Sequence, residues 1–111
     1  MFQQLINMIS GGGKANHLSG TDFKAKYLEI PKALLLDVRT PAEYAGGYLK
    51  GAKNINFFSP NFKADVQKLD KDKTYFVYCR SGNRSGQACD IMEQLGYTTY
   101  NLAGGIGAWP A

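Results

Sequence analysis

The sequence predicts an α/β domain in which helices cover both faces of a central parallel sheet. Short β-prone runs alternate along the chain with segments whose apolar residues recur at helical spacing. Two of the runs, 33–38 and 74–78, are mostly apolar, as strands buried on both faces of a parallel sheet are. The 111 residues are enough for one domain with a single core.

Residues 1–13 are predicted to form a separate N-terminal segment, and residues 14–111 form the domain. Apolar residues at helical spacing predict a short amphipathic helix over residues 2–9, followed by a glycine linker. We expect this helix to pack on its own domain, with contact to a membrane or a partner protein as the alternative. The chain has no recognisable secretion signal and no apolar run near the roughly 20 residues that span a bilayer, so we expect a cytoplasmic protein.

Within the domain, strands and helices are predicted in alternation. A capping motif at residues 19–22 begins the first helix, and Pro31 ends it. The second helix opens at Thr40 and Pro41, with Glu43 at its third position in a structural capping role. The other predicted elements are strands 17–18, 33–38, 52–56, 74–78 and 98–102, helices 62–69 and 85–95, and a final helical piece with Trp109 against the core.

The charged and metal-binding residues exclude several classes of function. The net charge of +4 comes mainly from scattered lysines without a dense basic run, which argues against nucleic-acid binding. Two cysteines and one histidine cannot supply the four ligands of a usual zinc site, and we expect neither a metal nor another cofactor. Arginine occurs at three positions, and two of them, Arg80 and Arg84, closely follow Cys79.

Cys79 lies where a predicted strand ends and a predicted helix begins. Unpaired N–H groups and the partial positive charge of a helix amino end favour a thiolate over a thiol. Gly82 allows the loop to turn its N–H groups inward as an anion-binding nest. The sequence therefore predicts an activated cysteine in a loop that holds a negative charge.

Asp37 and Arg39 follow another central strand at its carboxyl end, where open α/β sheets bind ligands. They would border the same site. Alternatively, Arg39 forms an ion pair with Glu43 at i,i+4 spacing, which requires no function.

Four stretches occur in an order and at a spacing that resemble a known family: LLDVRTPAEY at 35–44, GYLKGA at 47–52, YCRSGNRS at 78–85 and LAGGIGAW at 102–109. Together they resemble a single-domain rhodanese of the thiosulfate sulfurtransferase family. The resemblance implies a rhodanese-like three-layer α/β/α fold with a mainly parallel sheet of about five strands. One departure is Tyr48, where the family usually carries histidine; we expect it to open a strand and to affect packing instead of chemistry.

The resemblance also implies an activity. In a sulfurtransferase, the Cys79 thiolate would attack the sulfane sulfur of a donor such as thiosulfate, sulfite would leave, and the persulfide sulfur would pass to cyanide or a thiol. A protein could also serve as donor or acceptor. Expected roles in the loop are anion binding by Arg80 and Arg84, N–H donation by residues 80–84, hydroxyl donation by Ser81 and Ser85, and shaping of the turn by Gly82 and Asn83.

Two other functions stay open at this point. A persulfide carrier or sensing module would use the same cysteine with little turnover on free thiosulfate. A cysteine phosphatase or arsenate reductase is disfavoured, because phosphatase loops place five residues between cysteine and arginine and only four separate Cys79 from Arg84. Cys89 is expected to be a buried helix residue, with a role as a resolving cysteine as the alternative.

Overall fold

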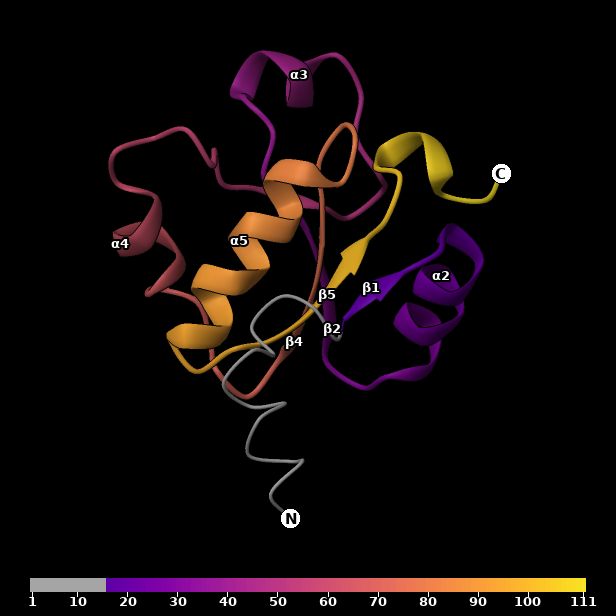
Figure 1. Ribbon diagram of the computed structural model, residues 1–111, viewed down its shortest axis with the longest axis horizontal. Coiled ribbons are helices and arrows are strands. Elements are labelled where there is room, and N and C mark those ends of the chain that lie inside the picture. The colour runs from indigo at the N-terminus through magenta and orange to yellow at the C-terminus, as the bar shows by residue number, and fades with distance from the viewer. Residues whose placement is uncertain (1–15) are drawn as a thin grey trace.

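The computed structural model describes residues 16–111 (Figure 1). The predicted N-terminal helix and glycine linker lie outside the described residues. Within the described range the sheet has five strands, all parallel, in the order β1-β5-β4-β2-β3. This architecture confirms the predicted α/β fold. The strands are β1 (His17–Leu18), β2 (Ala33–Asp37), β3 (Lys53–Asn54), β4 (Thr74–Tyr78) and β5 (Thr98–Leu102).

A helical segment follows each strand. These segments are α2 (Gly20–Glu29), α3 (Pro41–Ala45), α4 (Phe62–Val66), α5 (Asn83–Gln94) and the 3-10 helix η1 (Ile106–Ala108). The capping box predicted for α3 is present, because Thr40 and Glu43 each bond the backbone N–H of the other. Helix α4 is shorter than predicted, since the N–H of Leu69 bonds the carbonyl of Val66 and the chain tightens into turns.

The helices form two outer layers around the sheet. Helices α4 and α5 cover one face, and α2 and η1 cover the other (Figure 1). The Trp109 ring lies 6.1 Å from Phe23 and 6.0 Å from Tyr27, centroid to centroid, so it packs on the core as predicted. The core is divided between the two faces of the sheet. Buried side chains on the face covered by α4 and α5 include Val38, Val66, Val77, Ala88 and Met92, and those on the face covered by α2 and η1 include Leu35, Phe76, Tyr78 and Leu102.

The pairing of the central strands decides where a site can form. Strand β4 lies between β5 and β2, and its last residue, Tyr78, is in register with Asp37 at the end of β2. Helix α3 lies beyond the carboxyl ends of these strands (Figure 1). The chain segments that leave β2 and β4 therefore meet on one side of the domain. None of the helices over residues 16–111 combines the length and the hydropathy needed to cross a membrane.

Tyr48 does not open a strand, contrary to the prediction. It lies in the loop between α3 and β3, and β3 begins only at Lys53. The side chain is 51% exposed, and its ring stacks on Tyr44 with 4.1 Å between centroids. Because β3 is only two residues long at the edge of the sheet, the chain before it remains a loop.

Candidate active site

Cys79 is the first residue after β4, and it is fully buried. Its carbonyl accepts a hydrogen bond of 2.8 Å from the N–H of Ile106, which ties the residue to η1. The backbone then turns through residues 80–82 into α5. The predicted location of Cys79, between a strand's carboxyl end and a helix's amino end, is confirmed.

Three donors surround the sulfur of Cys79. The N–H of Gly82 lies 3.1 Å from Sγ, and Ser85 donates through both its N–H at 3.4 Å and its hydroxyl at 3.3 Å. Burial raises the pKa of the Cys79 thiol, but these hydrogen bonds, together with one from the backbone of Ser81, outweigh it and lower the pKa below its ordinary value. The anion nest thus extends to Ser85, one residue beyond the predicted range of 80–84.

Two glycines allow the loop to take this shape. Gly82 has a left-handed φ of 98° and precedes the first residue of α5, so the helix begins at Asn83, two residues earlier than predicted. Gly105 lies directly against the loop, because a Cβ added there would be 1.9 Å from the carbonyl oxygen of Arg80. The segment after β5 therefore packs directly against the backbone of the Cys79 loop.

Arg84 is bound by Glu43 and does not contact the sulfur. Its Nη1 lies 2.8 Å from Oε1 and its Nη2 lies 3.0 Å from Oε2 of that carboxylate. The guanidinium also lies over the Phe58 ring, 5.3 Å from the centroid. The hydrogen bonds from Arg84, with further ones from Thr40, lower the pKa of Glu43 from 4.5 to about 2. Glu43 therefore caps α3, as predicted, and also holds an arginine of the loop.

The remaining loop residues face solvent. Arg80, Ser81 and Asn83 are exposed, and the N–H of Asn83 donates to the Ser81 hydroxyl over 3.5 Å. Across residues 16–111 no ion pair involves Arg80. Of the predicted loop residues, Ser81, Gly82 and Ser85 thus donate to the sulfur through their backbone, and the Arg80 side chain has no ion pair within residues 16–111 and lies at the surface.

Asp37 and Arg39 form a buried ion pair with each other. Nη2 of Arg39 lies 2.6 Å from Oδ2 of Asp37 and also donates to the carbonyl of Gly47. The alternative pairing of Arg39 with Glu43 is wrong, because Thr40 has extended backbone angles and Arg39 therefore precedes the helix. The Arg39 guanidinium is 5.8 Å from the ring centroid of Tyr78, the residue that precedes Cys79. It supports the ends of β2 and β4.

Cys89 lies inside α5 and is 1% exposed. Burial raises the pKa of its thiol to about 12, so it stays protonated at neutral pH. Both cysteines are free. These observations favour the predicted structural role of Cys89.

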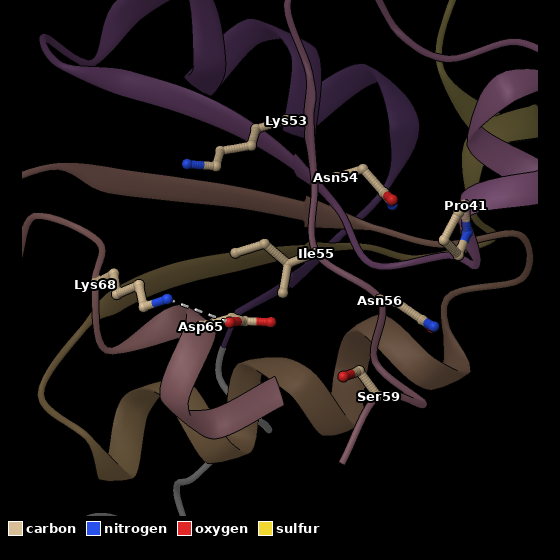
Figure 2. Close-up of a pocket in the computed structure, with 8 residues that line it drawn as sticks. All are labelled: Pro41, Lys53, Asn54, Ile55, Asn56, Ser59, Asp65 and Lys68. Carbon is tan, nitrogen blue, oxygen red and sulfur yellow. Dashed lines mark ion pairs between the residues drawn. The ribbon is translucent and has the colours of Figure 1, made fainter. Parts of the chain in front are cut away.

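A cavity of about 460 Å³ lies elsewhere, beside the edge strand β3 (Figure 2). It is lined by Pro41, Lys53, Asn54, Ile55, Asn56, Ser59, Asp65 and Lys68. None of the residues from Cys79 to Ser85 lines it. The cavity and the Cys79 loop are therefore separate features of the domain.

A family model described as "Rhodanese-like domain" matches residues 21–111. The chain belongs to the rhodanese-like domain family. It is 36% identical over 95 residues to a sulfurtransferase of Allochromatium vinosum, covering 85% of this chain and 87% of that protein. It is 38% identical over 71 residues to the thiosulfate sulfurtransferase PspE of Escherichia coli, covering 64% of this chain and 68% of the relative.

The fold of solved rhodanese-like domains agrees with this assignment. A rhodanese-like domain protein from Staphylococcus aureus superimposes with a TM-score of 0.74 at 29% identity, covering 86% of this chain and 91% of that one. The predicted resemblance and the predicted fold are both confirmed. As a rhodanese-like domain with sulfurtransferase relatives, the chain has a sulfurtransferase family role.

Two residues near the loop were missed by sequence reasoning. Asn101 on β5 donates to the carbonyl of Gly82 over 3.2 Å and lies 2.8 Å from Nδ1 of His17. A polar residue inside the otherwise β-prone run 98–102 is the signal that marks Asn101. No sequence signal links it to His17, because the two residues are 84 positions apart.

Proposed function

We propose that this rhodanese-like domain transfers a sulfane sulfur through a persulfide on Cys79. The observation that carries the proposal is the set of three hydrogen-bond donors around a buried Sγ with a lowered pKa. Such donors stabilise a thiolate, which is the nucleophilic form of cysteine, without a neighbouring general base. The sulfurtransferases among the relatives support the same reaction class.

In the first half of the cycle, the thiolate attacks the outer sulfur of a donor such as thiosulfate. A bond forms between Sγ and that sulfur, and the sulfur–sulfur bond of thiosulfate breaks. The electron pair of the broken bond leaves with sulfite, and the enzyme keeps an anionic persulfide. No proton has to move, so the absence of an acid or an imidazole at hydrogen-bonding distance from Sγ within residues 16–111 is compatible with the step.

In the second half, an acceptor attacks the terminal sulfur of the persulfide. Cyanide would leave as thiocyanate and a thiolate would leave as a persulfide, and in both cases the electron pair of the broken bond returns to Cys79. The inward N–H groups of the loop would hold the charge that the two half-reactions move between sulfur atoms. Ser81 and Asn83 shape the exposed part of this turn.

We further propose that the two arginines of the loop have different roles. The exposed Arg80 guanidinium, with no ion pair in the described part of the chain, would attract the anionic donor and the departing sulfite. Arg84 is already neutralised by Glu43. Its expected effect on the donor is therefore smaller than that of Arg80.

Loading with thiosulfate tests the proposal. The protein is incubated with thiosulfate, digested and analysed by mass spectrometry for one added sulfur atom on the Cys79 peptide; cyanide is then added and thiocyanate is measured. The Cys79→Ala variant is the control, and the Cys89 peptide of the wild-type protein should remain unmodified. Absence of loading, or loading that survives Cys79→Ala, would refute the proposal.

A second candidate is a persulfide carrier that a protein partner loads. The neutralisation of Arg84 by Glu43 favours it, because one exposed arginine is left in the loop to attract a dianion. Loading of Cys79 without thiocyanate release would support this function. Release of phosphate from an aryl phosphate would instead support the hypothesis that the domain is a cysteine phosphatase.

A further inference from the structure

A chain of hydrogen bonds links β1 to the sulfur of Cys79. Asn101, on β5, is 2% exposed. Its Nδ2 lies 2.8 Å from Nδ1 of His17 and 3.2 Å from the carbonyl oxygen of Gly82. The N–H of Gly82 in turn donates to Sγ of Cys79. The side chains of His17 and Asn101 are therefore connected to the sulfur through one residue of the loop, Gly82, whose carbonyl bonds Asn101 and whose N–H bonds Sγ.

The chemistry of these groups fixes how they are oriented. A carbonyl oxygen can only accept, so the amide nitrogen of Asn101 must face Gly82. Turning the amide over would place its oxygen against the Gly82 oxygen. Because the same nitrogen also faces His17, Nδ1 of that imidazole must accept, and its proton must be on Nε2.

The other end of the amide shows that its nitrogen is the important atom. Oδ1 of Asn101 is buried and has no hydrogen-bond partner among the described residues. Burying a polar atom without a partner is unfavourable, and an apolar side chain would fill the same space without that penalty. The two contacts of the nitrogen therefore give a reason for an asparagine at this position.

Gly86 makes room for the arrangement on α5. A Cβ at Gly86 would lie 3.3 Å from Cε1 of His17 and 3.5 Å from Nδ2 of Asn101. The imidazole and the amide thus both pack against the first turn of the helix that follows the Cys79 loop. Three elements, β1, β5 and α5, converge at this point.

We propose that Asn101 and His17 are positioning residues for Cys79. Asn101 anchors the carbonyl of Gly82 and so restrains the backbone of the residue whose N–H donates to the sulfur, and His17 holds the amide of Asn101 in the orientation that this requires. Neither side chain touches the reacting sulfur. The benefit for turnover rests on the proposed function, but the effect on the thiol itself can be measured without any sulfur donor.

The test measures the rate at which iodoacetamide alkylates Cys79 as a function of pH, followed on the Cys79 peptide by mass spectrometry. The Asn101→Leu variant should move the midpoint of this profile upward by about 0.5 to 1 pH unit, as expected when one hydrogen bond to the thiolate weakens. His17→Leu should move it in the same direction. His17→Asn, whose side-chain oxygen can accept in place of Nδ1, should restore the wild-type midpoint.

A matched control separates positioning from general stability. Asn54 also donates its amide to backbone carbonyls, those of Asp37 and Arg39, but it lies on β3. Asn54→Leu should lower the melting temperature without moving the midpoint. If Asn101→Leu loses as much stability as Asn54→Leu but alone shifts the midpoint, the shift is not a consequence of lower stability.

Unchanged midpoints in His17→Leu and Asn101→Leu would overturn the proposal. If Asn101→Leu does not fold, the comparison of His17→Leu with His17→Asn decides, because His17 is exposed and tolerates substitution. A protein that never loads sulfur from thiosulfate would refute the proposed function and leave the alkylation result valid. The two proposals can therefore fail separately.

Discussion

Glu43 binds Arg84 through both oxygens of its carboxylate, although the two residues are 41 positions apart in the chain. The same carboxylate accepts from the N–H of Thr40 and so completes the capping box of α3. One side chain therefore joins the helix beyond the sheet to the loop that carries Cys79.

Replacing Glu43 with glutamine should lower the free energy of unfolding by about 1–2 kcal/mol at pH 7, because the charge-assisted bonds to Arg84 are lost in a partly exposed site. The pKa of Glu43 is lowered from 4.5 to about 2 in the folded protein, so its contribution is complete above pH 4.5 and is lost as the pH falls toward 2. The difference between wild type and Glu43→Gln should follow that course in urea unfolding experiments.

Glu29→Gln is the matched control, because it removes an exposed carboxylate from α2. This variant should unfold like the wild type at every pH tested. A stability difference for Glu43→Gln that stays constant between pH 7 and pH 2 would show that Glu43 acts through packing and not through its charge.

The two arginines of the loop should respond differently to removal. Arg80→Ala should raise KM for thiosulfate by about 3- to 10-fold, the equivalent of one exposed ionic contact, and leave stability within about 0.5 kcal/mol. Arg84→Ala should mainly destabilise the protein, since it leaves the Glu43 carboxylate without its partner. Steady-state kinetics and urea unfolding of both variants provide the measurement. A larger rise in KM for Arg84→Ala would contradict the assigned roles.

The sequence was sufficient to predict the parallel sheet and the position of Cys79, because both depend on local patterns. Apolar runs mark β2 and β4, and a cysteine followed by Gly82 marks a turn into a helix. It was not sufficient to predict the partners of the charged residues. The i,i+4 rule suggested Arg39 and Glu43, but it applies within a helix, and the extended backbone of Thr40 separates the two.

Contacts between residues on neighbouring strands could not be predicted from the sequence either. His17 and Asn101 come together because β1 pairs with β5, and only the strand order reveals that neighbourhood. The hydroxyl of Ser85 was expected to donate, but its N–H lies outside the predicted donor range of residues 80–84; it reaches Sγ from the first turn of α5, which begins earlier than its apolar pattern indicates. The missed features are those that depend on tertiary packing.

The hydroxyl of Ser85 is expected to help lower the pKa of Cys79. It is buried and donates to Sγ over 3.3 Å. Ser85→Ala should therefore raise the midpoint of the alkylation profile by about 0.5 to 1 pH unit. Ser81→Ala is the matched control, because the Ser81 side chain is exposed and contributes to the sulfur only through its backbone. Equal midpoints for Ser85→Ala and wild type would show that the N–H groups alone activate the thiol.

Gly105 should be the least replaceable glycine beside the loop. It has a left-handed φ of 76°, and a Cβ there would overlap the carbonyl of Arg80 at 1.9 Å. Gly105→Ala should therefore lower the free energy of unfolding by about 2 kcal/mol or more and shift the Cys79 loop. The nearby Gly107 is the matched control, because a Cβ there would meet no atom within 4 Å.

Thermal and urea unfolding of both glycine variants test this contrast, and alkylation of Cys79 reports the loop. Gly107→Ala should keep the wild-type stability and the wild-type alkylation profile. Gly105→Ala should lose stability, and in the molecules that fold, Cys79 should need a higher pH to react, because the displaced Arg80 peptide precedes the turn that donates to Sγ. Wild-type behaviour of Gly105→Ala would mean that the segment after β5 does not support the loop.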